Sequence, residues 1–237
     1  MKRFIPILAL CLLISGLQAQ VIHDPMVKAR EVDDFRAIQV SGGIDVYLSQ
    51  GNSSSLAVSA KTAEWRDEIR TVVEDGVLFI TPTNSDKFLQ KLGNRQLKAY
   101  VSVQQLDKLI ASGACDIRVT GQLKMDKFEL KLSGASDFNG DIRTNSLEVQ
   151  LSGASDAVVK GSAKKLQVDV SGASDFKGYD FTVEECSARA SGASDINITV
   201  SRELQPRASG ASSINYRGDA VIRDIQTSGA GSVSKKG

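Results

Sequence analysis

Ser133-Gly134-Ala135-Ser136-Asp137 is a pentapeptide that recurs through the C-terminal half of this chain of 237 residues. Further intact copies begin at Ser152, Ser171 and Ser191, and variant copies begin at Ser112, Ser209 and Ser228. Successive copies begin 21, 19, 19, 20, 18 and 19 residues apart. A period near 20 residues that tolerates small slips is typical of a stacked repeat architecture.

Each copy is preceded by an alternating segment. Apolar residues lie one, three and often five places before the first serine, as at Leu147, Val149 and Leu151, and polar residues separate them. This pattern predicts a strand with one buried and one hydrated face. A glycine follows seven or nine residues after the motif serine, and it predicts a turn between two short strands of the repeat. These glycines are Gly121, Gly140, Gly161, Gly178 and Gly218.

The repeat therefore predicts an all-β fold, a right-handed parallel β-solenoid with rungs of about 20 residues, in which equivalent positions stack. Seven rungs at the usual inter-strand spacing of ~4.8 Å would form a rod of roughly 30 Å. A sandwich of antiparallel hairpins is the alternative. It would not require the same pentapeptide at one phase of every repeat.

The pentapeptide itself is predicted to be the corner of each rung. Glycine at its second place permits backbone angles that other residues avoid, and alanine at the third place suggests an inward slot without room for a larger side chain. On this interpretation Ala154→Leu would overpack the corner and destabilise the fold. The serines are expected to form hydroxyl ladders or to bond to the bending backbone. The corner glycines are Gly113, Gly134, Gly153, Gly172, Gly192, Gly210 and Gly229.

Aspartate at the fifth place raises the question of a binding site. Stacked carboxylates ~4.8 Å apart repel one another, so something must compensate for their charge. They could accept hydrogen bonds at their own corners, hold a column of calcium ions, or act in pairs as catalytic acids. The nine-residue glycine–aspartate repeat of calcium-binding β-rolls is absent from the sequence, and no basic residue is identified at a matching phase. The residues concerned are Asp116, Asp137, Asp156, Asp175 and Asp195.

The chain divides into four parts. Residues 1–19, with Lys2 and Arg3 before an apolar run, are predicted to be a secretory signal peptide. Residues 20–34 form a leader, 35–111 a β-rich part, and 112–237 the repeat solenoid. Phe35–Val40 followed by Ser41-Gly-Gly-Ile-Asp45 resembles a degenerate repeat, so both halves are expected to share one architecture. A short helix after Thr62 and a hairpin at Glu74–Gly76 are also predicted.

Composition excludes several classes of function. Removing residues 1–19 changes the formal net charge from +1 to −1, and a near-neutral chain lacks the electrostatic footprint of a nucleic-acid-binding protein. His23, the one histidine, has no neighbouring ligand in the sequence, and Cys115 has no identifiable base. We expect Cys115 and Cys186 to be unpaired small residues. Neither a catalytic nor a cofactor-binding residue can be named.

The Ser-Gly-Ala-Ser-Asp series, together with Gly43-Ile44-Asp45 and Asp75–Ile80, resembles the "putative auto-transporter adhesin, head GIN domain" family, exported proteins common in Bacteroidetes whose function is not established. Here Asp45 replaces the asparagine of the Gly-Ile-Asn name. The resemblance covers about residues 35 to 233 and implies adhesion without contributing catalytic residues.

The sequence thus predicts an exported, non-enzymatic, adhesin-like binding or structural protein of the cell envelope, located in the periplasm, at the surface or secreted. Glycan, protein and lipid are the candidate partners, and no cofactor is expected apart from a calcium ion in the aspartate column. A pectinase-like β-helix enzyme and a calcium-binding solenoid are the alternatives. A site is needed once, whereas a corner is needed in every rung, and for this reason the repetition favours a structural role for the motif.

Overall fold

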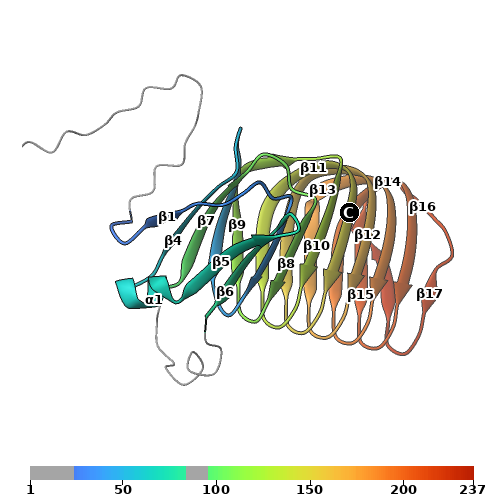
Figure 1. The fold of residues 1–237 in the computed structure, drawn as a ribbon. Helices are drawn as coiled ribbons and strands as arrows, with labels where there is room; N and C mark the ends of the chain where they lie inside the picture. Colours follow the sequence, from blue (N-terminus) through green and yellow to red (C-terminus); the bar gives the residue numbers. More distant parts are fainter. Residues whose placement is uncertain (1–23, 84–95) are drawn as a thin grey trace, which may run out of the picture.

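The computed structural model describes residues 24–83 and 96–237, and there the chain forms a parallel β-solenoid (Figure 1). Equivalent residues of successive repeats lie side by side, as Asp137, Asp156 and Asp175 do. Every described strand pair from β8 (Lys108–Ser112) onward is parallel. The predicted solenoid is therefore confirmed, and the antiparallel sandwich is excluded.

The solenoid has two sheets, which share its long central strands. The first runs in the spatial order β1, β4, β7, β3, β9, the first halves of β11 to β14, β15 and β18. The second runs β5, β6, β2, β8, β10, the second halves of β11 to β14, and then β16 and β17. The motif corners join the end of one rung to the start of the next and form the row of turns at the lower edge of Figure 1.

The elements up to residue 112 are β1 (Lys28–Arg30), β2 (Ala37–Ser41), β3 (Asp45–Gln50), β4 (Ser55–Ser59), α1 (Ala63–Asp67), β5 (Ile69–Glu74), β6 (Val77–Pro82), β7 (Lys98–Val103) and β8. The repeat region contains β9 (Asp116–Lys124), β10 (Lys127–Leu132), β11 (Asp137–Leu151), β12 (Asp156–Val170), β13 (Asp175–Ala190), β14 (Asp195–Ala208), β15 (Ser213–Arg217), β16 (Val221–Ile222), β17 (Gln226–Thr227) and β18 (Ser232–Lys235).

The glycines expected to separate two strands in each repeat do not end a strand in β11 to β14. Each of these four strands continues from one corner to the next. Gly140, Gly161 and Gly178 instead lie at or beside places where the pairing register shifts. A bulge accommodates an extra residue while pairing continues on both sides. These bulges therefore accommodate the differences of one or two residues in repeat length. The prediction of a turn at Gly140, Gly161 and Gly178 is wrong.

The alternating apolar residues form the core, as predicted. Leu147, Val149 and Leu151 are all buried, and their counterparts in neighbouring rungs are buried as well. Two further predictions are confirmed near the N-terminus. Thr62 caps α1 by accepting a hydrogen bond from the backbone N–H of Trp65 (3.3 Å), and β5 pairs with β6 in an antiparallel hairpin.

The corner alanine faces solvent, contrary to the predicted inward slot. Ala154 is exposed, as are the alanines at the same place in the other intact motifs, whereas the second serine of each of these copies is buried. The reason is the positive φ of the preceding glycine, +81° at Gly153. This angle turns the chain so that the alanine methyl points outward and the following serine points inward.

We accordingly expect Ala154→Leu to change the free energy of unfolding by less than about 0.5 kcal/mol, as exposed substitutions usually do. Urea denaturation of the wild type and the variant measures this directly. A loss of more than ~2 kcal/mol, the range of overpacked cores, would contradict an outward-facing alanine.

The two ends of the solenoid differ. α1, β1 and the β5–β6 hairpin lie at the N-terminal end, where β4 is antiparallel to β7 and β1 is antiparallel to β4 (Figure 1). At the other end β16, β17 and β18 each pair with a single strand of the described part of the chain. The predicted signal peptide and His23 lie outside the described residues. Among the described residues, no helix is long and apolar enough to cross a membrane.

Candidate functional site

The corner glycines form a column of close backbone contacts. Gly134, Gly153 and Gly172 have φ between +79° and +81°. The N–H of the alanine that follows each glycine donates to the carbonyl of the glycine one rung earlier, for example from Ala154 to Gly134 at 2.7 Å. A Cβ atom added to Gly153 would lie 2.5 Å from that same carbonyl oxygen. Glycine is therefore required at this position for two reasons: the positive φ angle, and the close approach of the backbones of neighbouring rungs.

The buried second serine of the motif joins successive corners. The Ser174 hydroxyl accepts a hydrogen bond from the backbone N–H of Ser155 (3.0 Å), and the Ser155 hydroxyl accepts one from Ser136 (3.3 Å). In the variant copy, the Cys115 thiol donates to the Ser112 carbonyl (3.3 Å), as the Ser136 hydroxyl does to Ser133. Buried hydroxyls thus satisfy corner amides, and this is the structural role that the repetition favoured.

The aspartate column forms as its spacing predicts. Asp116, Asp137, Asp156, Asp175 and Asp195 are in register, and Asp45 lies beside Asp116. Burial, followed by repulsion from the Asp116 carboxylate, raises the pKa of Asp45. The column is partly exposed and follows the outer surface of the first sheet.

Two basic residues compensate for this charge, contrary to the prediction that none lies at a matching phase. Arg118 forms an ion pair with Asp116 (2.8 Å), and Lys177 contacts both Asp156 (2.5 Å) and Asp175 (3.4 Å). The hydrogen bond to Asp156 raises the pKa of Lys177. Both cations lie two residues after a motif aspartate, where alternation returns the side chain to the same face.

The expectation that each aspartate is satisfied by its own corner is also incomplete. The Asp137 carboxylate accepts a hydrogen bond from the backbone N–H of Asp156, one rung away (3.3 Å). Within residues 24–83 and 96–237, no three His, Cys, Asp or Glu side chains gather where a metal ion could bind them together. A calcium column thus has no ligand cluster to support it in this part of the chain.

A long groove follows the motif corners on the second sheet, beside the first serine of each copy. Its volume is about 850 Å³. We call it the serine groove. One wall carries Ser133, Ser152, Ser171, Ser191, Ser209 and Ser228, and the other carries Ile110, Lys131, Gln150, Asp169, Arg189, Arg207 and Gln226. At the inter-strand spacing, six serines extend over roughly 24 Å.

The floor of the serine groove is backbone, because the residues between its walls point into the core. Leu151 and Val170 are each only 2% exposed. The Ser171 hydroxyl donates to the carbonyl of Leu151 (3.3 Å), and Ser152 does the same to Leu132 (3.4 Å). A hydroxyl has one donor and two acceptor positions, so each serine still offers acceptors to a ligand.

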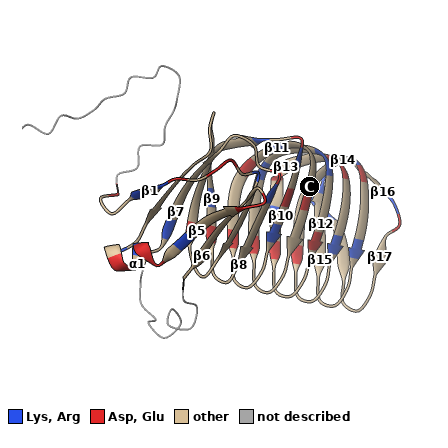
Figure 2. Cartoon of the chain, viewed as in Figure 1, with Lys and Arg blue, Asp and Glu red and all other residues tan. Residues whose placement is uncertain are grey.

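The charged wall of the groove has more cations than anions. Lys131, Arg189 and Arg207 line it with one carboxylate, Asp169, which lies 3.5 Å from Arg189, and Lys131 also pairs with Glu129 just outside the groove (2.6 Å). In Figure 2 both basic and acidic residues colour the strands of this sheet, with basic residues toward β17. The groove therefore offers guanidinium donors on one side and serine oxygens on the other.

These wall residues were not identified as a site from the sequence. Lys131, Gln150 and Asp169 belong to the polar residues of the alternating segments, and each lies two residues before a motif serine. That common offset was the available signal. It did not show that the corner beyond these residues turns outward and leaves a channel.

Cysteine and aromatic residues outside the groove have structural roles. Cys115 and Cys186 are buried and unpaired, as expected, and burial raises the pKa of the Cys186 thiol. Phe138 and Phe176 belong to the core, and Trp65 packs against it. Tyr47 and Tyr100 stack with ring centroids 5.1 Å apart. Burial, and then the nearby Asp24 carboxylate, raise the pKa of Tyr100 to about 12.

Solved structures with a similar fold include three from Bacteroides and Parabacteroides species. A putative adhesin from Bacteroides fragilis superposes with a TM-score of 0.80 at 19% identity, covering 89% of this chain and 96% of that one. A putative lipid binding protein from Parabacteroides distasonis gives 0.70 at 18% identity, covering 91% and 98%. A putative adhesin from the same species gives 0.71 at 17% identity, covering 89% and 96%. No match is found among curated proteins.

At these identities the solved structures establish the fold alone. The family is established separately, by a family model described as "putative auto-transporter adhesin, head GIN domain" that matches residues 34–220. The match begins one residue before Phe35, where the degenerate first repeat starts, and continues past the sixth corner. The chain belongs to the head GIN domain family of putative auto-transporter adhesins.

Proposed function

We propose that this protein is an exported, non-enzymatic adhesin-like protein of the cell envelope, and that its serine groove binds an extended acidic glycan. The groove itself carries this proposal. It is long and open, it repeats the same serine wall over six rungs, and Lys131, Arg189 and Arg207 line its other wall. Membership of an adhesin family supports a binding role.

The chemistry of the groove suits such a ligand. Sugar hydroxyls both donate and accept hydrogen bonds, so they can pair with the serine oxygens and with the amides of Gln150 and Gln226. A uronate carboxylate matches the planar fork of an arginine, which binds carboxylates through two parallel hydrogen bonds. Repeating walls suit a repeating polymer, because each rung can offer a sugar unit a similar set of contacts.

Cleavage of the glycan is less well supported than binding. Hydrolysis of a glycosidic bond generally requires two carboxyl groups across the scissile bond. The residues that line the serine groove include one carboxylate, Asp169, which is held by Arg189 and by Gln167 (3.3 Å). The stacked aspartates lie on the other sheet, where Arg118 and Lys177 neutralise part of their charge.

Calorimetric titration of residues 20–237 with polygalacturonate tests the proposal. We expect binding that weakens as salt is added, since screening reduces interactions between exposed charges. Replacing Arg189 and Arg207 by glutamine should raise the Kd roughly tenfold or more, for about 1 kcal/mol lost per exposed ion pair. Neutral dextran should bind far more weakly.

A matched control removes two cations elsewhere on the surface. Arg143 and Lys164 lie at the bend opposite the motif corners, and replacing both by glutamine should leave the Kd unchanged. An equal loss of affinity in this control would indicate nonspecific charge attraction. Binding of phosphatidylglycerol vesicles but not of polygalacturonate would contradict the proposed glycan ligand and indicate a lipid ligand. One structural neighbour is described as a putative lipid binding protein.

A further inference from the structure

The C-terminal end of the solenoid has open strand edges. Among the described strands, β16 and β17 end the second sheet and β18 ends the first, each with one neighbour. Stacked repeats normally need a terminal cap, because an open edge presents unpaired backbone groups to other chains. Val221 and Ile225, 57% and 56% exposed, are the exposed large hydrophobic side chains of the described residues, and Val221 belongs to β16.

The backbone of β16 shows which groups are free. Arg223 donates its N–H to the Leu204 carbonyl of the previous rung (2.9 Å). Backbone groups alternate in direction along a strand, so the N–H and carbonyl of Ile222 point away from β14. β18 is arranged likewise, since Ser232 and Lys236 donate to Ser212 and Tyr216 (3.0 and 2.8 Å). Both sheets therefore end with hydrogen-bonding groups directed along the solenoid axis.

The side chains along β16 form a self-complementary pattern. Asp219, Val221 and Arg223 are all exposed, whereas Ala220 and Ile222 between them pack against the core. An antiparallel copy of this segment centred on Val221 places Asp219 opposite Arg223 of the second copy, and Val221 opposite its own equivalent. In this register Ala220 and Ile222 form the hydrogen-bonded pairs, and Ile222 is the residue whose groups are free. Charge, apolar contact and hydrogen-bond direction therefore agree on one register.

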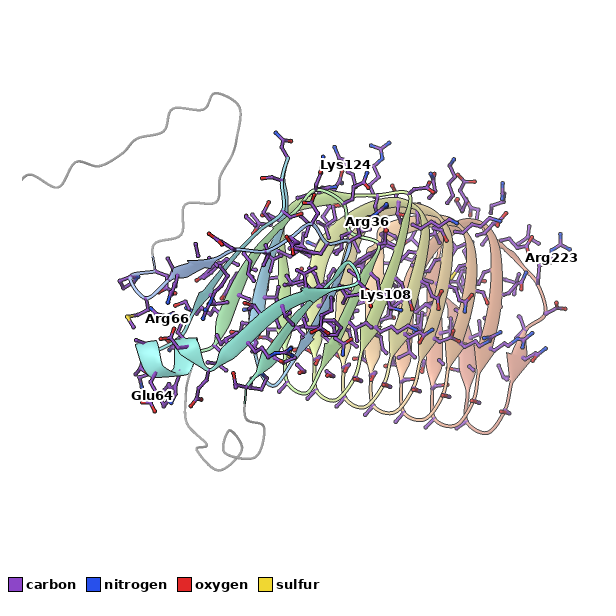
Figure 3. The ribbon with its side chains drawn as sticks, in the orientation of Figure 1. Arg36, Glu64, Arg66, Lys108, Lys124 and Arg223 are labelled. Atoms are coloured by element: carbon purple, nitrogen blue, oxygen red, sulfur yellow. The ribbon has the colours of Figure 1, made fainter. Side chains whose placement is uncertain are left out.

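The charged residues are free to change partners. Asp219 has a side chain 99% exposed and contacts Lys235 at 3.4 Å, whereas Arg223 is 62% exposed and lies 3.7 Å from Glu203. Exposed ion pairs of this length contribute little. Figure 3 shows Arg223 extending from the end of the solenoid, and Glu64 and Arg66 at the opposite end.

From these observations we infer that the C-terminal edge is an interface between two copies of this chain, which join tail to tail about a two-fold axis through Val221. An isologous contact of this kind closes after two copies. At the opposite end β5 also ends its sheet with one described neighbour, β6, but its exposed charges, Arg70 and Glu74, already pair with each other within the strand (3.4 Å). The dimer would carry two serine grooves and so increase avidity for a polymeric ligand.

Sedimentation velocity of residues 20–237, from micromolar to near-millimolar concentration, tests this interface. We expect reversible formation of a dimer and no larger species. D219R and R223D should each raise the dimer Kd on the order of a hundredfold, because like charges then face each other twice. An equimolar mixture of D219R and R223D should form a heterodimer, since opposite charges face each other again at both contacts.

Two further variants separate the edge from the rest of the surface. Val221→Lys should abolish dimerisation, whereas Thr120→Lys, on the exposed side of β9, should leave it intact. Thermal melting confirms that each variant is folded. A monomer at all concentrations, growth beyond the dimer, or a mixture of the two charge variants that fails to associate would overturn the proposal. Binding of polygalacturonate per protomer is expected to persist in the monomeric variants, so the two proposals fail independently.

Discussion

Gly153→Ala is expected to lower the free energy of unfolding by about 3 kcal/mol or more, from backbone strain and overpacking together. Gly153 has φ +81°, a region that alanine avoids. Its added Cβ would also lie 2.5 Å from the Gly134 carbonyl oxygen and 3.0 Å from the Gly134 nitrogen. These atoms belong to the backbone of the neighbouring rung, so they can move only if the stacking of corners is disturbed.

A second glycine separates the two parts of this effect. Gly76, in the β5–β6 hairpin, has φ +74°, but a Cβ added there would meet no atom within 4 Å. Gly76→Ala should therefore cost only the backbone strain, about 1–2 kcal/mol. Urea denaturation of both variants measures the difference. Equal losses would mean that the close stacking of corner glycines contributes nothing beyond their dihedral angle.

Phe176→Ala is expected to destabilise the protein by about 3–5 kcal/mol, the usual cost of removing a buried phenylalanine. Phe176 is fully buried and lies beside Ala157 of the previous rung and Ile196 of the next. Phe138 lies on the other side of Ala157, so one small side chain separates the two phenylalanines in this inward column. Gly178 is close to the ring, since a Cβ there would be 2.5 Å from it. A cavity in this column would have rigid walls.

Phe79→Ala is the matched control, because Phe79 is only half-buried on the outer face of β6. We expect it to cost clearly less than Phe176→Ala, since the side chain already contacts water. Chemical denaturation of the two variants, with the same probe, gives the comparison. A loss of less than ~1.5 kcal/mol for Phe176→Ala would indicate that neighbouring side chains fill the vacated space.

The fold was predictable because its signals are periodic and local. Alternation placed Leu147, Val149 and Leu151 inside the solenoid without knowledge of any contact. The recurrence of one pentapeptide put the aspartates in register. The same repetition distinguished a corner from a singular site, and the hydrogen bonds of the buried serines agree with that distinction.

The functional surface was less predictable. It depends on the direction in which the corner side chains point and on contacts between residues about twenty positions apart. A pentapeptide does not reveal which way its alanine points; the positive φ of Gly153 decides that. Likewise, Lys177 lies near in sequence to Asp175 but compensates Asp156 of the previous rung as well. Such contacts exist only once the register between rungs is established.

By itself, then, the sequence determined the repeat, the buried face and the stacked corners of this protein, since side-chain alternation and glycine conformation act within a few residues. Tertiary structure alone decided that the corners turn outward, that the bulges at Gly161 and Gly178 absorb the uneven spacing, and that a groove lies beside the serines. It also left Val221 exposed at an open edge. These features arise from packing one rung on the next, and no single rung contains the information to specify them.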